Sequence, residues 1–84
     1  MEVTKHNIMH YFYERYPQAV THEEIQEVFN LPIVVTTVVL QDLWSRGKLL
    51  WYSEYYRIGE THYNIMREGI EDGTLEFGAD STNN

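Results

Sequence analysis

Two helix-start signals lie close together in the first half of this 84-residue chain. The first is the capping box Thr21-His22-Glu23-Glu24, in which the Thr21 hydroxyl can accept from the third helical amide and Glu24 can reach back to the capping residue. A short helix ending near Asn30 is expected, with an inward side of Ile25, Val28 and Phe29. The second signal is Pro32, whose missing N–H costs nothing in the first turn of a helix. The chain is therefore expected to contain two consecutive helices joined by a tight turn.

The helix after Pro32 is expected to run from Ile33 to Arg46 and to end at Gly47, a residue suited to a left-handed cap. Its first half is rich in β-branched residues, so a strand over residues 33–40 is the competing prediction. The helix is favoured because the apolar residues continue a 3.6-residue period and Gln41-Asp42 interrupts any strand. The expected inward side of this helix consists of Thr36, Val39, Leu40 and Leu43.

An earlier helix is expected over residues 4–16, with Thr4 as its cap and Pro17 ending it, because proline disfavours helical geometry in the residue before it. Apolar and aromatic residues recur along this segment at helical spacing, which indicates one buried side. That side is formed by Ile8, Tyr11 and Phe12 and is widened by Met9, Tyr13 and Tyr16.

From Lys48 the apolar pattern changes to a period of two, which is typical of a β-hairpin. The preferred prediction places the turn at Gly59-Glu60, because glycine suits the first central position of a type II′ turn. The shared face then consists of Leu50, Tyr52, Tyr56, Ile58, Tyr63 and Ile65. The alternative places the turn at Ser53-Glu54 and makes residues 61–72 a fourth helix, with Tyr63, Met66 and Ile70 inward. Gly69 within that helix counts against it by about 1 kcal/mol.

The chain carries 13 acids against 6 bases, a net charge of −7, and no cysteine. Residues 68–84 hold five of the acids and no base, so we expect a domain over residues 1–67 followed by an acidic, partly disordered C-terminal tail. No apolar stretch approaches the roughly 18 residues of a membrane span, and no signal peptide is recognisable. A cytoplasmic location without a membrane partner is therefore expected.

The predicted order of elements resembles the winged helix-turn-helix family. The resemblance rests on the segments VTHEEIQEVFNLP and LQDLWSRGKL and on the spacing of Leu40, Leu43, Gly47 and Leu49, and it covers residues 4 to about 66. It implies an α+β fold, a small winged helix-turn-helix with three helices and a C-terminal β-hairpin wing. It also implies that the third helix enters the major groove of DNA and that the wing touches the DNA backbone or minor groove.

The outward side of the predicted third helix carries no lysine or arginine in its central part, which argues against base readout. The residues expected there, facing a partner or DNA, are Val34, Thr37, Val38, Gln41, Trp44 and Ser45. Arg46, Lys48 and Arg57 are the candidates for phosphate contacts. Exposed apolar clusters with an aromatic residue at their edge are more typical of protein contacts than of nucleic-acid contacts.

These observations predict a small winged-helix regulator of transcription that acts mainly through protein–protein contacts of the apolar third helix and a Tyr-rich wing. The expected partner is the transcription machinery, a repressor or a second copy of the chain. The alternative is a dimeric, sequence-specific DNA-binding regulator that binds double-stranded DNA as a homodimer. The sequence contains no recognisable catalytic constellation, so neither an enzyme, a small-molecule substrate, a cofactor nor a metal site is expected. The acidic tail is a candidate to cover Arg46, Lys48 and Arg57.

Overall fold

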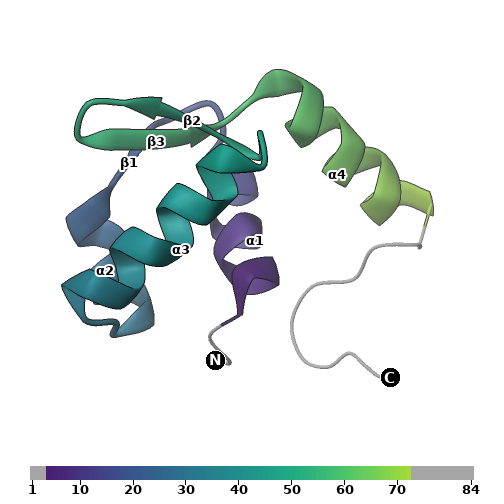
Figure 1. The fold of residues 1–84 in the computed structure, drawn as a ribbon. Helices are drawn as coiled ribbons and strands as arrows, with labels where there is room; N and C mark the ends of the chain where they lie inside the picture. Colours follow the sequence, from purple (N-terminus) through teal and green to yellow (C-terminus); the bar gives the residue numbers. More distant parts are fainter. Residues whose placement is uncertain (1–3, 73–84) are drawn as a thin grey trace.

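Four helices and three short strands make up the part of the chain that the structure, a computed structural model, describes, residues 4–72. In chain order the elements are α1 (Lys5–Arg15), β1 (Val20–Thr21), α2 (His22–Phe29), α3 (Ile33–Ser45), β2 (Leu49–Tyr52), β3 (Tyr55–Ile58) and α4 (Glu60–Asp72). The strands form one antiparallel sheet in the order β1-β3-β2. In Figure 1 the hairpin lies over one end of the α1–α3 cluster, and α4 leaves β3 on the side away from α2. The fold is therefore α+β.

Local capping explains where the first two helices begin. The Thr4 hydroxyl accepts from the Asn7 amide at 3.0 Å, and the Thr21 hydroxyl accepts from the Glu24 amide at 3.1 Å. Both predicted caps are thus confirmed. The Glu24 carboxylate does not serve as the second half of a capping box, since it accepts from the Tyr11 hydroxyl and the Arg15 guanidinium on α1. This contact ties α2 to α1.

The segment from Ile33 is a helix, as predicted, and not the competing strand. Asn30 ends α2 in a left-handed conformation with a φ of 54°, and the chain then bends by 116° into α3. Gly47 follows α3 with a φ of +77°, a conformation that glycine adopts without steric cost. Tertiary burial outweighs the weak helix propensity of the β-branched residues, because one side of α3 is fully buried.

The core collects side chains from every element. Its buried apolar members are Ile8, Met9, Phe12, Val20, Ile25, Phe29, Leu40, Leu43, Leu49, Tyr56, Ile58 and Met66. Thr36 is also buried, and its hydroxyl donates to the Pro32 carbonyl at 2.9 Å, which satisfies a polar group that would be costly to bury alone. Val28 was expected inward but is 42% exposed, so the buried side of α2 is narrower than predicted.

The preferred hairpin register is wrong. The turn lies at Ser53-Glu54, with Ser53 in the left-handed region at a φ of 60°, and Leu49 pairs with Ile58. The two-residue turn lies inside the segment that was predicted as one continuous strand, and it pairs odd-numbered residues before the turn with even-numbered residues after it. The residues before the turn therefore lie on the opposite face from the one predicted. Leu49 is consequently buried, whereas Leu50 and Tyr52, which were expected on the shared face, are exposed.

The second strand of the expected wing is instead the helix α4, so the described residues form four helices where three were predicted. Tyr63 stacks on Tyr13 and Tyr16 of the first helical segment, with ring centroids 4.8 and 4.0 Å apart, and Met66 is buried. These contacts outweigh the cost of Gly69 in the helix interior. Because α4 continues to Asp72, the expected boundary at residue 67 falls inside it. Residues 73–84, the rest of the expected acidic tail, lie outside the described residues.

No single helix in the described range is long and apolar enough to cross a membrane. The helices α2 and α3 reach that length and composition only when taken together. The 116° bend separates them, and each buries one side against the protein core.

Candidate functional site

The outward side of α3 is apolar, uncharged and exposed. Val34 is 69% exposed and Val38 is 62% exposed, and Gln41, Trp44 and Ser45 also face outward. We call these five residues the α3 face. Within α3, all of which the structure describes, the sequence contains no lysine or arginine. The opposite side is buried through Thr36, Leu40 and Leu43, as the helical period predicted.

Thr37 belongs to the contact between α2 and α3 and only partly to the surface. Its hydroxyl lies 2.8 Å from Nε2 of His22, whose Nδ1 lies 2.9 Å from the side-chain oxygen of Gln26. Thr37 is half-buried as a result. The structure therefore separates Thr37 from the other residues predicted to face a partner, because its hydroxyl holds α3 against α2.

An aromatic contact extends the α3 face onto the hairpin. The rings of Trp44 and Trp51 meet edge to face, with centroids 5.7 Å apart and planes 67° apart. Trp51 is 52% exposed, and its indole N–H donates to the Ser53 carbonyl at 2.5 Å. Trp51 alternates along β2 with Leu50 and Tyr52, which point to the other side of the sheet. The hairpin thus has exposed apolar side chains on both faces.

Only part of the expected Tyr-rich wing is available as a surface. Tyr52 and Tyr55 are paired across the hairpin and are both nearly half exposed. Tyr56 is a core residue, and burial raises the pKa of its phenol. Tyr63 lies on α4 and stacks on α1. Two of the tyrosines expected on the wing therefore have structural roles.

The strand β2 lies at the edge of the sheet, with β3 as its only partner in the described part of the chain. An edge strand presents unpaired backbone N–H and C=O groups on its outer side. The exposed edge therefore adds backbone hydrogen-bonding groups beside the apolar side chains of Leu50 and Trp51.

Arg46, the first predicted phosphate contact, pairs with a carboxylate of its own helix. Its Nε lies 3.1 and 3.0 Å from the two carboxylate oxygens of Asp42, and Lys5 Nζ lies 2.7 Å from the same group. Hydrogen bonds from Lys5 and then from Arg46 hold the pKa of Asp42 below its usual value. One carboxylate therefore offsets part of the charge of two bases at this end of α3.

Arg57, another predicted phosphate contact, lies among aromatic rings. Its guanidinium carbon is 5.9 Å from the ring centroid of Tyr16 and 6.0 Å from that of Tyr52. A hydrogen bond to the Tyr52 hydroxyl raises the pKa of Arg57. The three predicted phosphate contacts therefore have different surroundings, with Arg46 beside a carboxylate and Arg57 beside aromatic rings.

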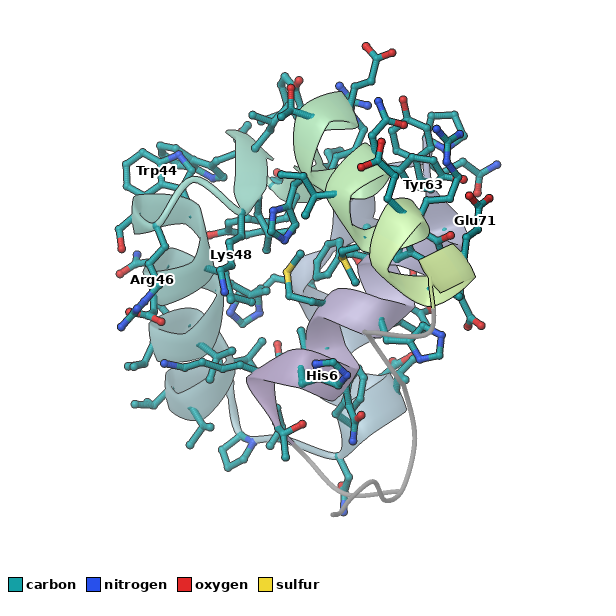
Figure 2. The ribbon with its side chains drawn as sticks, turned by 90° about the vertical axis from the view of Figure 1, so that its right-hand side faces the viewer. His6, Trp44, Arg46, Lys48, Tyr63 and Glu71 are labelled. Carbon is teal, nitrogen blue, oxygen red and sulfur yellow. The ribbon has the colours of Figure 1, made fainter. Side chains whose placement is uncertain are left out.

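A cleft of about 440 Å³ opens between α1, the end of α3 and α4. We call it the basic cleft; it is lined by Lys5, His6, Met9, Leu43, Arg46, Lys48, His62, Ile65 and Met66. Figure 2 looks onto this side of the molecule, with His6 on α1 and with Arg46 and Lys48 at the end of α3. Burial, and then the charge of Lys48, lower the pKa of His62.

Sequence reasoning identified Arg46 and Lys48 but not the rest of the cleft. Lys5, His6 and His62 come from α1 and α4, which are far apart in sequence. No local spacing relates these residues, and the preferred hairpin, with its turn at Gly59-Glu60, would place residue 62 on a strand. Only the position of α4 brings them together.

His10 and Glu14 contact each other on the surface of α1. His10 Nε2 lies 3.1 Å from a carboxylate oxygen of Glu14, one helical turn away. Between residues 4 and 72, no group of three His, Asp or Glu side chains is close enough to hold a metal ion. This pair acts as a helix surface contact.

No protein-family model, no curated protein and no solved structure matches this chain.

Proposed function

We propose that this protein is a small regulatory domain of the winged-helix type, which acts in the cytoplasm on transcription by binding another protein through the α3 face. The observation that carries the proposal is the exposure of Val34 and Val38 on a helix without a lysine or arginine. Monomeric proteins rarely expose contiguous apolar patches without a binding role. The α3 face then buries its valines against a partner.

The order of elements supports the winged-helix part of the proposal. A helix, a short strand, two helices joined by a tight turn and a hairpin follow one another, and the strands pair in the order β1-β3-β2. Three helices followed by a hairpin are the order expected from the family resemblance, whereas the strand β1, the turn at Ser53-Glu54 and the helix α4 depart from the preferred prediction. In such a scaffold α3 is the helix that meets the partner.

The paired tryptophans support a protein partner. Trp44 and Trp51 are each about half exposed and contact one another at the end of the α3 face. Tryptophan is enriched among the residues that dominate the binding energy of protein interfaces, because its large ring buries much area at little conformational cost. The valines extend this anchor along α3.

Charge disfavours the alternative, a dimeric DNA-binding regulator. On the α3 face, Gln41 is the side chain suited to bidentate reading of a base edge, and no arginine or lysine accompanies it. Arg46 is paired with Asp42, Arg57 packs on tyrosine rings, and the whole chain carries −7. Tight DNA binding needs several phosphate neutralisations. Even a dimer of this chain would present few lysine or arginine side chains that are free to contact phosphates.

The test is capture of partners from an extract of the native cell by the full-length chain, with and without nuclease. The variant Val38→Glu places a charge in the α3 face, and Val28→Glu is the matched control, since Val28 is 42% exposed on α2. We expect one protein to bind wild type and Val28→Glu after nuclease treatment and to be lost from Val38→Glu. Circular dichroism of both variants checks that they fold.

The same capture decides between the partners. Dependence on intact DNA would favour the alternative, and unchanged binding by Val38→Glu would refute a role for the α3 face. Sedimentation of the pure protein tests self-association. A dimer that Val38→Glu dissociates would identify the partner as a second copy of the chain.

A further inference from the structure

The basic cleft concentrates positive charge in an acidic protein. Lys5, Arg46 and Lys48 all line it, and the lining contains no aspartate or glutamate among the described residues. Asp42 lies beside the cleft and pairs with Lys5 and Arg46. Three bases against one carboxylate leave an excess of positive charge, although the whole chain carries −7.

Lys48 differs from Lys5 and Arg46, the other two bases of the cleft, which both pair with Asp42. It is half-buried, and within the described residues its ammonium forms no ion pair. Burial first, and then the positive charge of Lys48, lower the pKa of the nearby His62 imidazole. In Figure 2, Glu71 and Tyr63 lie on the side of α4 away from Lys48 and Arg46. Partial burial of a cation is unfavourable unless an opposite charge lies beside it, and a bound anion would supply that charge to Lys48.

The floor of the cleft is apolar and adaptable. Met9, Leu43 and Met66 are almost completely buried, and Ile65 is 58% exposed at the rim. Methionine side chains are flexible and polarisable, so they can adjust to ligands of different shape. The volume of about 440 Å³ lies in the range of small-molecule sites.

We propose that the basic cleft binds a small organic anion that joins a carboxylate to an apolar body, such as a short alkyl chain or an aromatic ring. The carboxylate lies against Lys48 and Arg46, and the apolar body covers the two methionines and Ile65. An inorganic anion would leave the exposed Ile65 side chain at the rim without an apolar contact, and a neutral apolar molecule would offer no opposite charge to Lys48. The site is separate from the α3 face and does not depend on the proposed partner.

The test is a titration of the full-length, ¹⁵N-labelled protein, followed by amide chemical shifts. Octanoate is the probe, acetate lacks its apolar body, and 1-octanol lacks its charge. We expect saturable shifts at cleft residues with octanoate, and binding at least roughly tenfold weaker for acetate and for 1-octanol, because each loses one kind of contact. Equal binding of either control, no saturation, or shifts confined to Val34 and Val38 would overturn the proposal.

Two charge-matched variants locate the carboxylate. Lys48→Gln removes the unpaired base and is expected to weaken octanoate binding roughly tenfold. Arg67→Gln removes the same charge from a residue that packs over Tyr63 and does not line the cleft, so it is expected to leave binding unchanged. An equal loss in both variants would indicate long-range charge alone and would refute the site. Arg46→Gln replaces Lys48→Gln if the latter does not fold.

The imidazole of His62 supplies an independent readout. The groups around the cleft are the bases Lys5, Arg46 and Lys48, the second imidazole of His6, and Asp42 beside them. A carboxylate bound there stabilises the imidazolium and raises the pKa of His62. We expect octanoate, but not 1-octanol, to move the His62 ring-proton titration to higher pH. An unchanged titration at saturating octanoate would contradict the placement of the carboxylate.

Discussion

The α3 face and the basic cleft border the same helix and have opposite chemistry. The α3 face exposes Val34 and Val38 and has no charged side chain of its own, whereas the cleft holds Arg46 from the end of α3 beside Lys48. Successive side chains of a helix turn by about 100°, so one helix can border two surfaces that share no residue. The net charge of −7 describes neither surface.

Asp42 keeps the two surfaces distinct. It lies between them on α3 and binds both Arg46 and Lys5, which holds these bases on the cleft side of the helix. The α3 face therefore stays uncharged although a base ends the helix. A protein contact on one side and an anion on the other can then act through the same rigid element.

Leu40→Ala is expected to have the largest effect, because it removes the side chain that supports both surfaces. Leu40 is completely buried, and such truncations cost about 2–5 kcal/mol of unfolding free energy. Val38→Ala, on the exposed side of the same helix, is expected to cost within about 0.5 kcal/mol. Urea unfolding of both variants measures the difference. Equal costs would mean that Val38 is packed within the protein and is not a surface anchor.

Trp44→Ala and Trp51→Ala are expected to weaken partner binding by about 2 kcal/mol each, as for central aromatic anchors. Because the two rings contact each other, the double variant is expected to lose less than the sum, with a coupling of about 0.5–1.5 kcal/mol. Titration calorimetry of the wild type, the two single variants and the double variant with the captured partner measures these losses. Octanoate binding is the control, since neither tryptophan lines the cleft. Additive losses would contradict a shared anchor.

Ionic strength is expected to separate the two surfaces. Raising salt from low to well above physiological concentration screens the cleft cations and is expected to weaken octanoate binding severalfold. Binding at the uncharged α3 face is expected to change little. Parallel titrations at several salt concentrations measure both dependences. A partner affinity that falls as steeply as octanoate affinity would instead indicate a charged contact on α3.

Acid is expected to have the smallest effect, through Asp42. Its pKa is lower in the folded state than in the unfolded state, so its contribution to stability is complete above the unfolded value and is lost as pH falls through the folded value. Asp42→Asn is expected to lower the melting temperature slightly at neutral pH and to reduce its fall between neutral and acidic pH. Thermal unfolding across this range measures the change. An identical pH dependence would show that the contact with Lys5 and Arg46 adds nothing.

Local chemistry in the sequence was sufficient to predict where the first three helices begin and end to within a residue or two. Thr4, Thr21 and Gly47 act on backbone groups within a few residues of themselves, so their roles follow from neighbouring positions alone. The outward position of Val34 and Val38 likewise follows from the helical period, which is a local property of the chain.

Contacts between distant segments determine the hairpin register, the formation of α4 and the basic cleft. The hairpin register depends on which of two plausible turns forms, and α4 is stabilised where Tyr63 stacks on α1 and Met66 enters the core. The same docking places His62 near Lys48 and creates the basic cleft. Packing free energy of this kind depends on residues brought together from separate elements, and no periodicity within one segment encodes it.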